Sequence, residues 1–367
     1  MKSLKTSSLF RLAALLVIAV IAICLVGFVA EGWQSEPQKQ PESGETDENS
    51  GNTDENTDGG ETVTPTPPTP PEYVHYLTGL EVSAADYGQK PLCFITDTAA
   101  PTYGIYGASL MIEIPIEGGK SRFLVYQNDI KNLGKIGSIT QGRDCIARIL
   151  DFFGGIAVQN GSDDMHPAGT SPSRIIFDLS QNSGYSYEES SSYLYSNKDL
   201  LLAGLQNAGI GLGSSEGMTM PFHFTPHFSD AVTFTTTAQT ITLPFGASNE
   251  TNLYYDTAAG QYLLGKGGQI KTDLLNGKNV GFTNAFVLFA DSTTYESVDQ
   301  TKMIVDTDGG GKGYYFTHGT ACAIEWHLDA AGKLVFKNEN GEVLSANRGT
   351  SYIAFYKASL ASGVVFS

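Results

Sequence analysis

Two apolar runs in the first third of the chain are short enough to be strands rather than helices. They cover Pro91–Thr96 and Ser109–Ile116, and both are rich in residues that line buried strands. Glu113 is the single charged residue of the second run. If its carboxylate faces inward it needs a partner, which Arg122 or Arg143 could supply. If it faces outward, it belongs to the polar side of an edge strand. The pattern leaves both interpretations open.

Apolar residues at a period near 3.6 predict two helices. The first covers Arg143–Phe153, where apolar side chains share one face and charged side chains share the other. The second covers Ser196–Ala208. Ser196 and Asp199 have the spacing of a capping box, and Gly209 follows as a C-terminal cap.

Beyond about Ala231 the pattern changes to threonine-rich alternation and then to short apolar runs such as Ala285–Phe289 and Tyr352–Tyr356. Glycine-containing turn signals separate these runs. They are Asp256–Gly260, Gly265–Gly268, Asn276–Gly277, Asp308–Gly313, Ala330–Gly332 and Asn338–Gly341. The pattern predicts strands and turns without helices in this part of the chain.

These elements together predict an α+β fold in two domains. Residues 73–235 would form an N-terminal mixed α/β domain with a few helices packed on a sheet. Residues 236–367 would form a mostly β C-terminal domain. The two would meet near residues 225–240, where helix-bearing sequence gives way to strand-only sequence.

The stretch from Glu117 to Arg143 combines turn signals with charge. Gly118-Gly119 suits a tight turn before the apolar run that follows, and Gly134–Gly142 is interpreted as a turn that opens the first helix. A helix N-terminus presents free backbone N–H groups, which favour an anionic or carbonyl-bearing partner, and Lys135 would add positive charge there. Two ordinary turns with solvent-facing charges are the alternative.

A polar segment follows the short apolar run at residues 156–158. It contains Asn160 and then Asp163, Asp164 and His166. This acidic and histidine trio has neither EF-hand nor zinc-site spacing, so a solvated turn is favoured over a metal site and no cofactor is predicted. The candidate ligand-binding residues are Glu113, Glu117, Arg122, Lys135, Arg143, Asn160 and Asp163.

The N-terminal region carries a membrane signal. Leu12–Ala30 has nineteen residues without a charge, follows Lys2, Lys5 and Arg11, and would span roughly 28 Å as a helix. A signal-peptide cleavage site needs small residues at its −3 and −1 positions, and this segment does not provide both. A lipidation site needs a small residue before the cysteine, whereas Ile23 precedes Cys24. We expect an uncleaved anchor at residues 1–30 that contacts the membrane through residues 12–30. Cleavage and lipidation of Cys24 are the alternatives.

Residues 31–72 are of low complexity, with eleven acidic residues, one lysine and a proline-rich end. Such a segment cannot bury enough apolar surface to fold, so it is predicted to be a disordered stalk. The positive flank of the anchor would remain in the cytoplasm and place the folded part outside the cell membrane, in a Gram-positive-type envelope.

Charge and motifs exclude several classes of function. The net charge is −17, and no basic stripe is present, which argues against nucleic acid as a partner. Cys93, Cys145 and Cys322 are widely spaced, which argues against a disulfide framework or a zinc site. No GxSxG, HExxH, Walker loop or GxGxxG occurs in the strand–helix setting that its chemistry needs.

The order of several short motifs resembles the YerB-like family of exported bacterial lipoproteins, a family of unknown function with N- and C-terminal domains. The resemblance covers about residues 76–357. The matching segments are Leu77–Leu80, Ile116–Phe123, Lys135–Arg143, Phe177–Leu179, Tyr262–Asp273, Asn284–Val287, Gly311–Phe316, Glu325-Trp326 and Gly349–Ile353. The resemblance implies a two-part exported protein.

The chain departs from the family pattern at polar positions. Ala99-Ala100-Pro101 stands where the family tends to have Ala-Arg-Pro. A later family motif tends to have two arginines. Here Thr140 takes the place of the first, and only the second, Arg143, is kept. Ser191-Ser192-Tyr193 replaces a Pro-His-Asn triplet, and Gln159 or Asn160 replaces a histidine. If those groups line a cleft in relatives, a site for an anionic ligand would be weaker here.

Two functions from different classes fit these observations. The first is a non-catalytic envelope protein that binds a wall polymer or a membrane protein. The second is an envelope hydrolase or transferase that acts on a glycan or peptide through Glu113 or Glu117 with Arg122 and Arg143. Convergence of Glu117, Arg122 and Arg143 with Asp163 in a pocket would favour a site, whereas arginines pointing apart into solvent would not.

Overall fold

The computed structural model describes residues 73–84, 86–161, 174–189, 193–213, 220–296 and 301–367. These described residues group into one compact unit. The predicted anchor at residues 1–30 and the stalk at residues 31–72 lie outside the described residues. Within the described part, no helix has both the length and the apolar character needed to cross a membrane.

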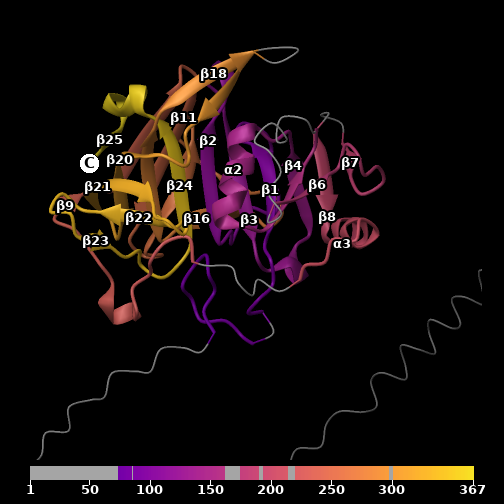
Figure 1. Cartoon of the computed structure of the whole chain (residues 1–367), viewed down its shortest axis with the longest axis horizontal. Coiled ribbons are helices and arrows are strands. Elements are labelled where there is room, and N and C mark those ends of the chain that lie inside the picture. The colour runs from indigo at the N-terminus through magenta and orange to yellow at the C-terminus, as the bar shows by residue number, and fades with distance from the viewer. Residues whose placement is uncertain (1–72, 85, 162–173, 190–192, 214–219, 297–300) are drawn as a thin grey trace, which may run out of the picture. The chain divides into compact units, whose positions relative to one another are not determined.

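One large sheet receives strands from both halves of the chain (Figure 1). Along the sheet the order is β23-β22-β21-β20-β17-β24-β2-β3-β1-β5-β6, and β9 pairs with β21 at the side. The strands are β1 Leu92–Asp97, β2 Leu110–Pro115, β3 Ser121–Gln127, β5 Ile156–Gln159, β6 Ile175–Asp178, β9 Thr236–Thr237, β17 Asn284–Ala290, β20 Gly310–Thr317, β21 Thr320–Leu328, β22 Leu334–Lys337, β23 Val343–Leu344 and β24 Ser351–Lys357. The apolar runs at residues 91–96 and 109–116 are therefore confirmed as strands.

The two halves of the chain join at β2 and β24. These strands pair in parallel, from Leu110 opposite Ser351 to Glu113 opposite Ala354. β24 pairs on its other side with β17, also in parallel. Sequences on either side of the predicted boundary near residues 225–240 thus contribute adjacent strands to one sheet, and their division into two domains stays a prediction.

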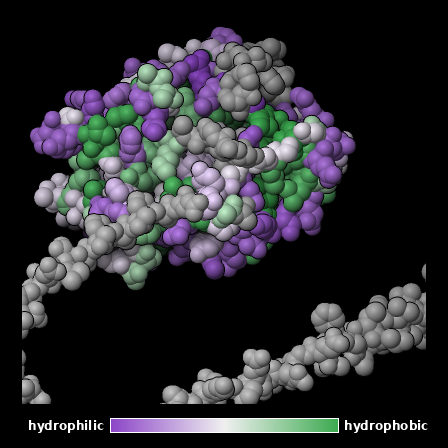
Figure 2. Space-filling model, turned by 60° about the horizontal axis from the view of Figure 1, so that its bottom comes forward, coloured by the Kyte–Doolittle hydropathy of each residue, from purple (hydrophilic) through white to green (hydrophobic). Residues whose placement is uncertain are grey.

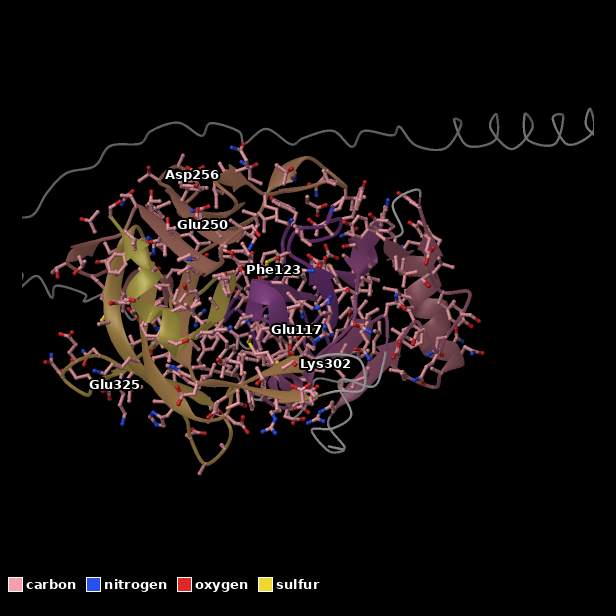
Figure 3. All side chains as sticks on the ribbon, turned by 90° about the horizontal axis from the view of Figure 1, so that it is seen from above. Glu117, Phe123, Glu250, Asp256, Lys302 and Glu325 are labelled. Carbon is pink, nitrogen blue, oxygen red and sulfur yellow. The ribbon has the colours of Figure 1, made fainter. Side chains whose placement is uncertain are left out.

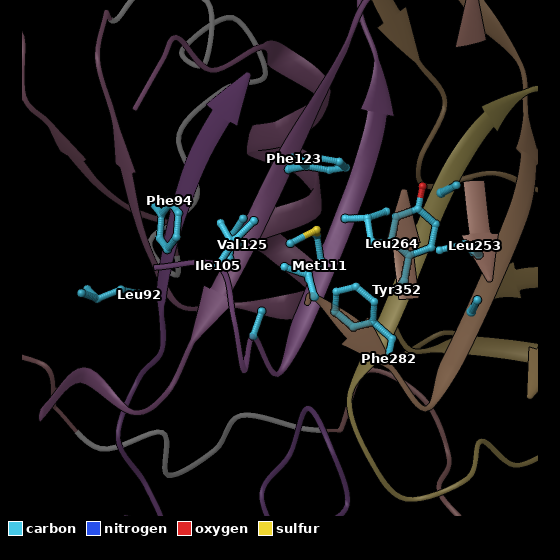
Figure 4. Packing of buried hydrophobic residues seen from close by; sticks show 14 of the residues in the cluster. Leu92, Phe94, Ile105, Met111, Phe123, Val125, Leu253, Leu264, Phe282 and Tyr352 are labelled. Carbon is cyan, nitrogen blue, oxygen red and sulfur yellow. The ribbon is translucent and has the colours of Figure 1, made fainter. Parts of the chain in front are cut away.

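A second, six-stranded sheet packs on one face of the large sheet. It contains β10 Thr240–Gly246, β11 Asn249–Asp256, β12 Gln261–Lys266, β13 Gln269–Ile270, β16 Gly281–Phe282 and β25 Val365–Phe366. Buried side chains from both sheets meet between them, including Met111, Phe123, Leu253, Phe282 and Tyr352 (Figure 4). This layer is the first of two apolar cores.

The second core lies on the opposite face of the large sheet, beneath helix α2, Asp144–Phe153. Ile146, Ile149 and Leu150 of α2 are fully or almost fully buried there. The prediction of a helix here, with its apolar face buried, is therefore confirmed. On the face that Figure 2 shows, hydrophilic residues are interspersed with apolar patches.

The remaining strands form small sheets around the two cores. The three-stranded sheet contains β4 Lys135–Ile139, β7 Tyr187–Glu188 and β8 Leu194–Asn197, and the two-stranded sheets are β14 Thr272–Asp273 with β15 Lys278–Asn279 and β18 Ser292–Glu296 with β19 Thr301–Val305. The 3₁₀ turns are η1 Glu117–Gly119, η2 Ile130–Asn132, η4 Phe228–Asp230 and η5 Ala358–Gly363. Two predicted turns are corrected. The segment Gly134–Gly142 contains strand β4, and the predicted turn Asp308–Gly313 overlaps strand β20, which begins at Gly310.

Helix α3, Lys198–Asn207, begins two residues later than predicted. Its N-cap is Asn197, whose side-chain oxygen accepts a hydrogen bond from the Leu200 backbone N–H at 2.9 Å. The predicted cap, Ser196, is buried and donates instead to the Tyr185 carbonyl at 2.6 Å. The described part of the chain is thus mostly β with few helices, mixed in its N-terminal half and β-rich in its C-terminal half.

Candidate functional site

Glu117 occupies the tight turn η1 between β2 and β3. Gly118 and Gly119 follow it with φ of 72° and 70°, a left-handed conformation that side chains with a Cβ adopt at a cost. The predicted glycine turn is therefore confirmed. It fixes the Glu117 carboxylate at the end of the β2–β3 hairpin, beside the start of α2.

Arg143 is the N-cap residue of α2 and pairs with Glu117. Its Nη2 lies 2.5 Å from Glu117 Oε1, and its Nε lies 3.3 Å from Oε2, so the contact is bidentate. The third nitrogen, Nη1, donates to the Gly142 carbonyl at 2.8 Å. The Arg143 side chain is only 3% exposed. The partner expected for this cation at a helix N-terminus is thus a carboxylate of the same chain.

The charge state of Glu117 follows from these contacts. Burial alone would raise the pKa of Glu117. The hydrogen bond from Arg143, the local backbone N–H and the positive charges of Arg143 and Arg122 outweigh burial and lower the pKa below its usual range. A carboxylate held ionised in this way is a poor general acid at neutral pH.

Arg122 lies on β3 next to this pair and is largely buried. Its Nη1 donates to the Thr140 hydroxyl. The Thr140 carbonyl in turn accepts the backbone N–H of Asn160 at 3.0 Å. Four of the candidate residues, Glu117, Arg122, Arg143 and Asn160, therefore lie in one neighbourhood, where they make contacts within the chain. Their role as a ligand site stays a prediction.

Gln159 and Asp178 belong to the same neighbourhood and were not chosen as site residues from the sequence. They end the parallel strands β5 and β6, and the Gln159 Nε2 donates to Asp178 Oδ2 at 3.2 Å. Gln159 Oε1 also accepts the Gly142 N–H at 2.9 Å, next to the start of α2. The sequence signal that could have identified Gln159 and Asp178 is their position, a polar residue at the end of each apolar strand. Ligand sites in such sheets lie at the carboxyl ends of parallel strands.

Strand β19 from the C-terminal half lies over this neighbourhood, against both η1 and α2. Figure 3 shows its Lys302 on the same side of the body as Glu117. An ion pair between Arg148 Nη1 and Asp308 Oδ2, at 3.0 Å, ties α2 to the segment after β19. The Glu117–Arg143 pair is therefore partly covered by the second half of the chain.

Glu113 is fully buried, and it points to the other face of the large sheet. Its carboxylate accepts hydrogen bonds from four side chains. These are Ser121 Oγ at 2.5 Å, Thr251 Oγ1 at 2.8 Å, Tyr352 OH at 2.6 Å and Lys266 Nζ at 3.0 Å. The inward-facing interpretation of Glu113 is thus confirmed.

The predicted partners of Glu113, Arg122 and Arg143, are wrong. Side chains alternate across a strand, and Glu113 shares the face of Met111, which packs toward the six-stranded sheet. Arg122 alternates with Phe123 and points to the α2 face. The cation that neutralises Glu113 is Lys266, which also donates to Asn249 Oδ1 and Thr251 Oγ1, each at 2.7 Å.

Lys135 makes contacts of its own, apart from those of the Glu117–Arg143 pair. Its Nζ lies 2.7 Å from Glu189 Oε2 and 3.9 Å from the ring centroids of both Tyr103 and Tyr195. This is a cation held by a carboxylate and two aromatic faces. The structure does not support the prediction that Lys135 adds charge to the start of α2, because Lys135 lies in strand β4.

Asp163, together with Asp164 and His166, lies outside the described residues. Its membership of the site stays a prediction. Within the residues that the structure describes, no group of three or more His, Cys, Asp or Glu side chains is arranged to hold a metal ion.

The three described cysteines are free thiols. Cys93 and Cys145 are fully buried, and burial raises the pKa of Cys145 to about 12 and that of Cys93 further still. Thiols with such pKa values remain protonated at neutral pH and are weak nucleophiles.

Two family models match the chain in tandem. "Protein of unknown function (DUF3048) N-terminal domain" matches residues 77–210, and "Protein of unknown function (DUF3048) C-terminal domain" matches residues 241–353. A curated relative is the "Putative lipoprotein YerB" of Bacillus subtilis (strain 168), which is 25% identical over 74% of this chain and 80% of that protein.

A solved structure is also similar. It is the crystal structure of the YerB protein from Bacillus subtilis, which matches with a TM-score of 0.68 and 21% identity. The match covers 81% of this chain and 100% of that one. At this level of identity the likeness shows a shared fold.

Proposed function

Because the chain belongs to the DUF3048 family, whose function is unknown, we propose a function from the geometry of its own residues. It acts as a tethered, extracytoplasmic protein of the cell envelope that binds a wall polymer or an envelope protein. It does not catalyse a reaction on that partner.

One observation carries the non-catalytic part of this proposal. The two carboxylates that the sequence offered for acid–base chemistry, Glu113 and Glu117, are both engaged within the described part of the chain. Glu113 is fully buried under four hydrogen-bond donors, and Glu117 is paired bidentately with Arg143. Paired carboxylates that cleave a glycosidic bond must flank the substrate, whereas these two serve opposite faces of one sheet.

The tether is supported by the sequence of residues 12–30 and by the lipoprotein name of the curated relative. We propose an uncleaved helix at Leu12–Ala30, with lipidation of Cys24 as the alternative. Mass spectrometry of the mature protein distinguishes them. An N-terminal peptide that begins before residue 12 supports the helix, whereas a lipid-modified peptide that begins at Cys24 or an unmodified one that begins at Glu31 contradicts it.

The binding role is tested in intact cells. The full chain is crosslinked through a photoreactive residue placed at exposed surface positions, and the captured partner is identified by mass spectrometry. Capture of one envelope polymer or protein, repeated from independent cultures, is the expected result. Crosslinks that scatter over unrelated abundant proteins would count against a specific binding role.

The absence of catalysis is tested separately. Isolated cell-wall material is incubated with the purified full chain, and soluble products are analysed by mass spectrometry. No product above the buffer control is expected. Product release that disappears in the Glu117→Gln variant, while that variant still folds, would instead support the hydrolase or transferase.

A further inference from the structure

Two adjoining hollows open over the C-terminal half, away from Glu117. The larger, about 440 Å³, lies between residues 233–236, β21 and the turn at residues 338–340. The smaller, about 280 Å³, continues over β20 and β21. Both are lined by Tyr314, Ala323 and Glu339, so they adjoin and form one groove, here named the Tyr314 groove. Each volume is of the order found for small-molecule sites.

Small residues create the groove. Ala321 and Ala323 of β21 and Gly313 of β20 line it where neighbouring positions carry aromatic side chains. Ala323 lies directly opposite Tyr314 in the antiparallel pair of β20 and β21. The missing side-chain volume at Ala323 therefore leaves space beside the Tyr314 ring.

The Tyr314 ring is held in place by aromatic neighbours on two sides. Its centroid lies 5.8 Å from that of Phe289 with an interplanar angle of 88°, and 5.1 Å from that of Phe366 with an angle of 68°. Edge-to-face packing of this kind fixes the ring orientation. The ring is half-buried and borders both hollows, so it forms a preorganised apolar platform in the groove.

Hydrogen-bonding groups surround this platform. Glu339 and Asn340 project from the exposed turn after β22, and Glu325 lies on β21 opposite Lys312 of β20. Two carboxylates and one ammonium give the groove a negative balance. An anionic polymer would be repelled there, whereas a neutral ligand with many hydroxyl and amide groups would find both acceptors and donors.

The groove offers little to an extended peptide. A peptide that adds to a sheet needs a run of open strand edge. The outer edge of β21 is already paired with β9 at Thr320 and Ala321, and with β22 from Glu325 to Leu328. The open stretch between these pairings is three residues long, Cys322 to Ile324, which is short for strand addition.

We propose that the Tyr314 groove binds a neutral glycan, with the C–H face of a sugar ring on Tyr314 and its hydroxyl or N-acetyl groups on Glu339, Asn340 and Glu325. Pyranose rings combine an apolar C–H face with a polar rim, which matches an aromatic platform surrounded by carboxylate and amide groups. This inference rests on the proposed binding function and names the ligand class for it.

The groove holds its ligand without reacting with it. Cys322 is the only thiol that lines it, and burial, followed by the nearby Glu339 charge, raises the pKa of Cys322 above its usual value. The thiol donates to the Ala323 carbonyl at 3.2 Å. It is protonated and occupied, and so is a weak nucleophile.

The test is calorimetric titration of the full chain, purified in detergent, with a β-1,4-linked tetramer of N-acetylglucosamine. Saturable binding is expected for the wild type. Tyr314→Ala, which removes the platform, and Ala323→Phe, which fills the space beside it, should each weaken binding at least about tenfold. Tyr314→Phe keeps the ring and should retain binding.

Ala330→Phe is the matched control, because Ala330 lies in the exposed turn after β21 and does not line the groove. It should bind as the wild type does. Thermal melts establish that each variant is folded, and if Tyr314→Ala fails to fold, Ala323→Phe and Tyr314→Phe still decide the question.

Three results would overturn the proposal: no binding of the tetramer by the wild type, equal binding by Ala323→Phe and Ala330→Phe, or binding of a wall-type peptide in the groove in place of the saccharide. If the tetramer fails to bind while crosslinking in cells still captures a specific partner, the glycan groove is rejected and the binding function stands.

Discussion

Arg143 is the residue whose chemistry most clearly needed a partner. A cation at a helix N-terminus opposes the helix dipole, and its guanidinium is buried. The structure supplies Glu117, 26 positions earlier in the chain, together with the Gly142 carbonyl. The pair therefore neutralises a charge misfit within the fold and fixes η1 against the start of α2.

Replacing Arg143 by alanine should destabilise the protein. It leaves the Glu117 carboxylate, only 21% exposed, beside a helix start without its counter-ion, and breaking a buried pair costs about 3–5 kcal/mol. We expect a loss near the lower end of that range in urea denaturation, with part of it recovered in the double variant Arg143→Met/Glu117→Gln.

Lys131→Ala is the control for this measurement, because the Lys131–Asp86 ion pair is formed by exposed side chains. Its removal should leave the denaturation midpoint almost unchanged. An Arg143→Ala loss below about 1 kcal/mol would show that the Glu117–Arg143 pair behaves like an exposed one.

His75 should make stability depend on pH. Burial lowers the pKa of His75 to about 4, against 6.5 for an exposed histidine. Between these values the unfolded chain binds a proton that the folded chain does not, so stability is fully present above pH 6.5 and is lost as pH falls toward 4. The full difference corresponds to about 3 kcal/mol.

Denaturation midpoints between pH 7.5 and 5 measure this effect, above the range in which most carboxylates titrate. His75→Gln should flatten the profile, whereas the exposed His223→Gln should keep the wild-type slope. Parallel profiles for the wild type and His75→Gln would show that His75 does not titrate in this way.

At the scale of elements, helix α3 shows how neighbouring residues divide two roles. Ser196 and Asn197 are both good N-cap types, and either satisfies the sequence pattern. The side chain of Ser196 turns inward to the Tyr185 carbonyl, because β8 places it on the buried side. Asn197 is then left to cap the helix.

Asn197→Ala should cost about 1 kcal/mol of stability, because it removes the acceptor of the Leu200 N–H. Asn197→Ser should restore most of it, since serine is also a good N-cap residue. Chemical denaturation of the two variants is the measurement. If Asn197→Ala leaves the stability unchanged, Asn197 does not cap the helix to any measurable extent.

At the scale of the whole molecule, the large sheet and the Glu113 cluster bind the two halves together. β2 and β24 pair across the predicted boundary, and Thr251, Lys266 and Tyr352 from the C-terminal half all donate to Glu113. Separation of the halves would expose a strand edge and a buried carboxylate at once.

Limited proteolysis tests this arrangement. Cleavage within residues 225–240 should produce two fragments that still elute together in size-exclusion chromatography and separate only in denaturant. As a control, the Lys266→Met variant leaves Glu113 without its cation and should let the nicked halves separate at a lower urea concentration. Fragments that separate in native buffer would instead support two independent domains.

The sequence by itself determined the local elements. Apolar runs, the 3.6 period and the glycine pair predicted β1, β2, α2 and η1, because strand alternation, helix periodicity and positive φ are properties of neighbouring residues. It also predicted that the chain reversal at Gly118-Gly119 brings Glu117 near Arg122, since the two residues flank one turn.

The tertiary structure decided the partners that come from far along the chain. Lys266 neutralises Glu113 from 153 positions away, and β24 lies beside β2, although nothing near Glu113 in the sequence indicates either. The Tyr314 groove likewise needs β20, β21 and β25 to meet. Sequence pattern predicts whether a side chain is buried, but which distant strand lies against it depends on how the two sheets pack. Only the folded chain supplies that packing.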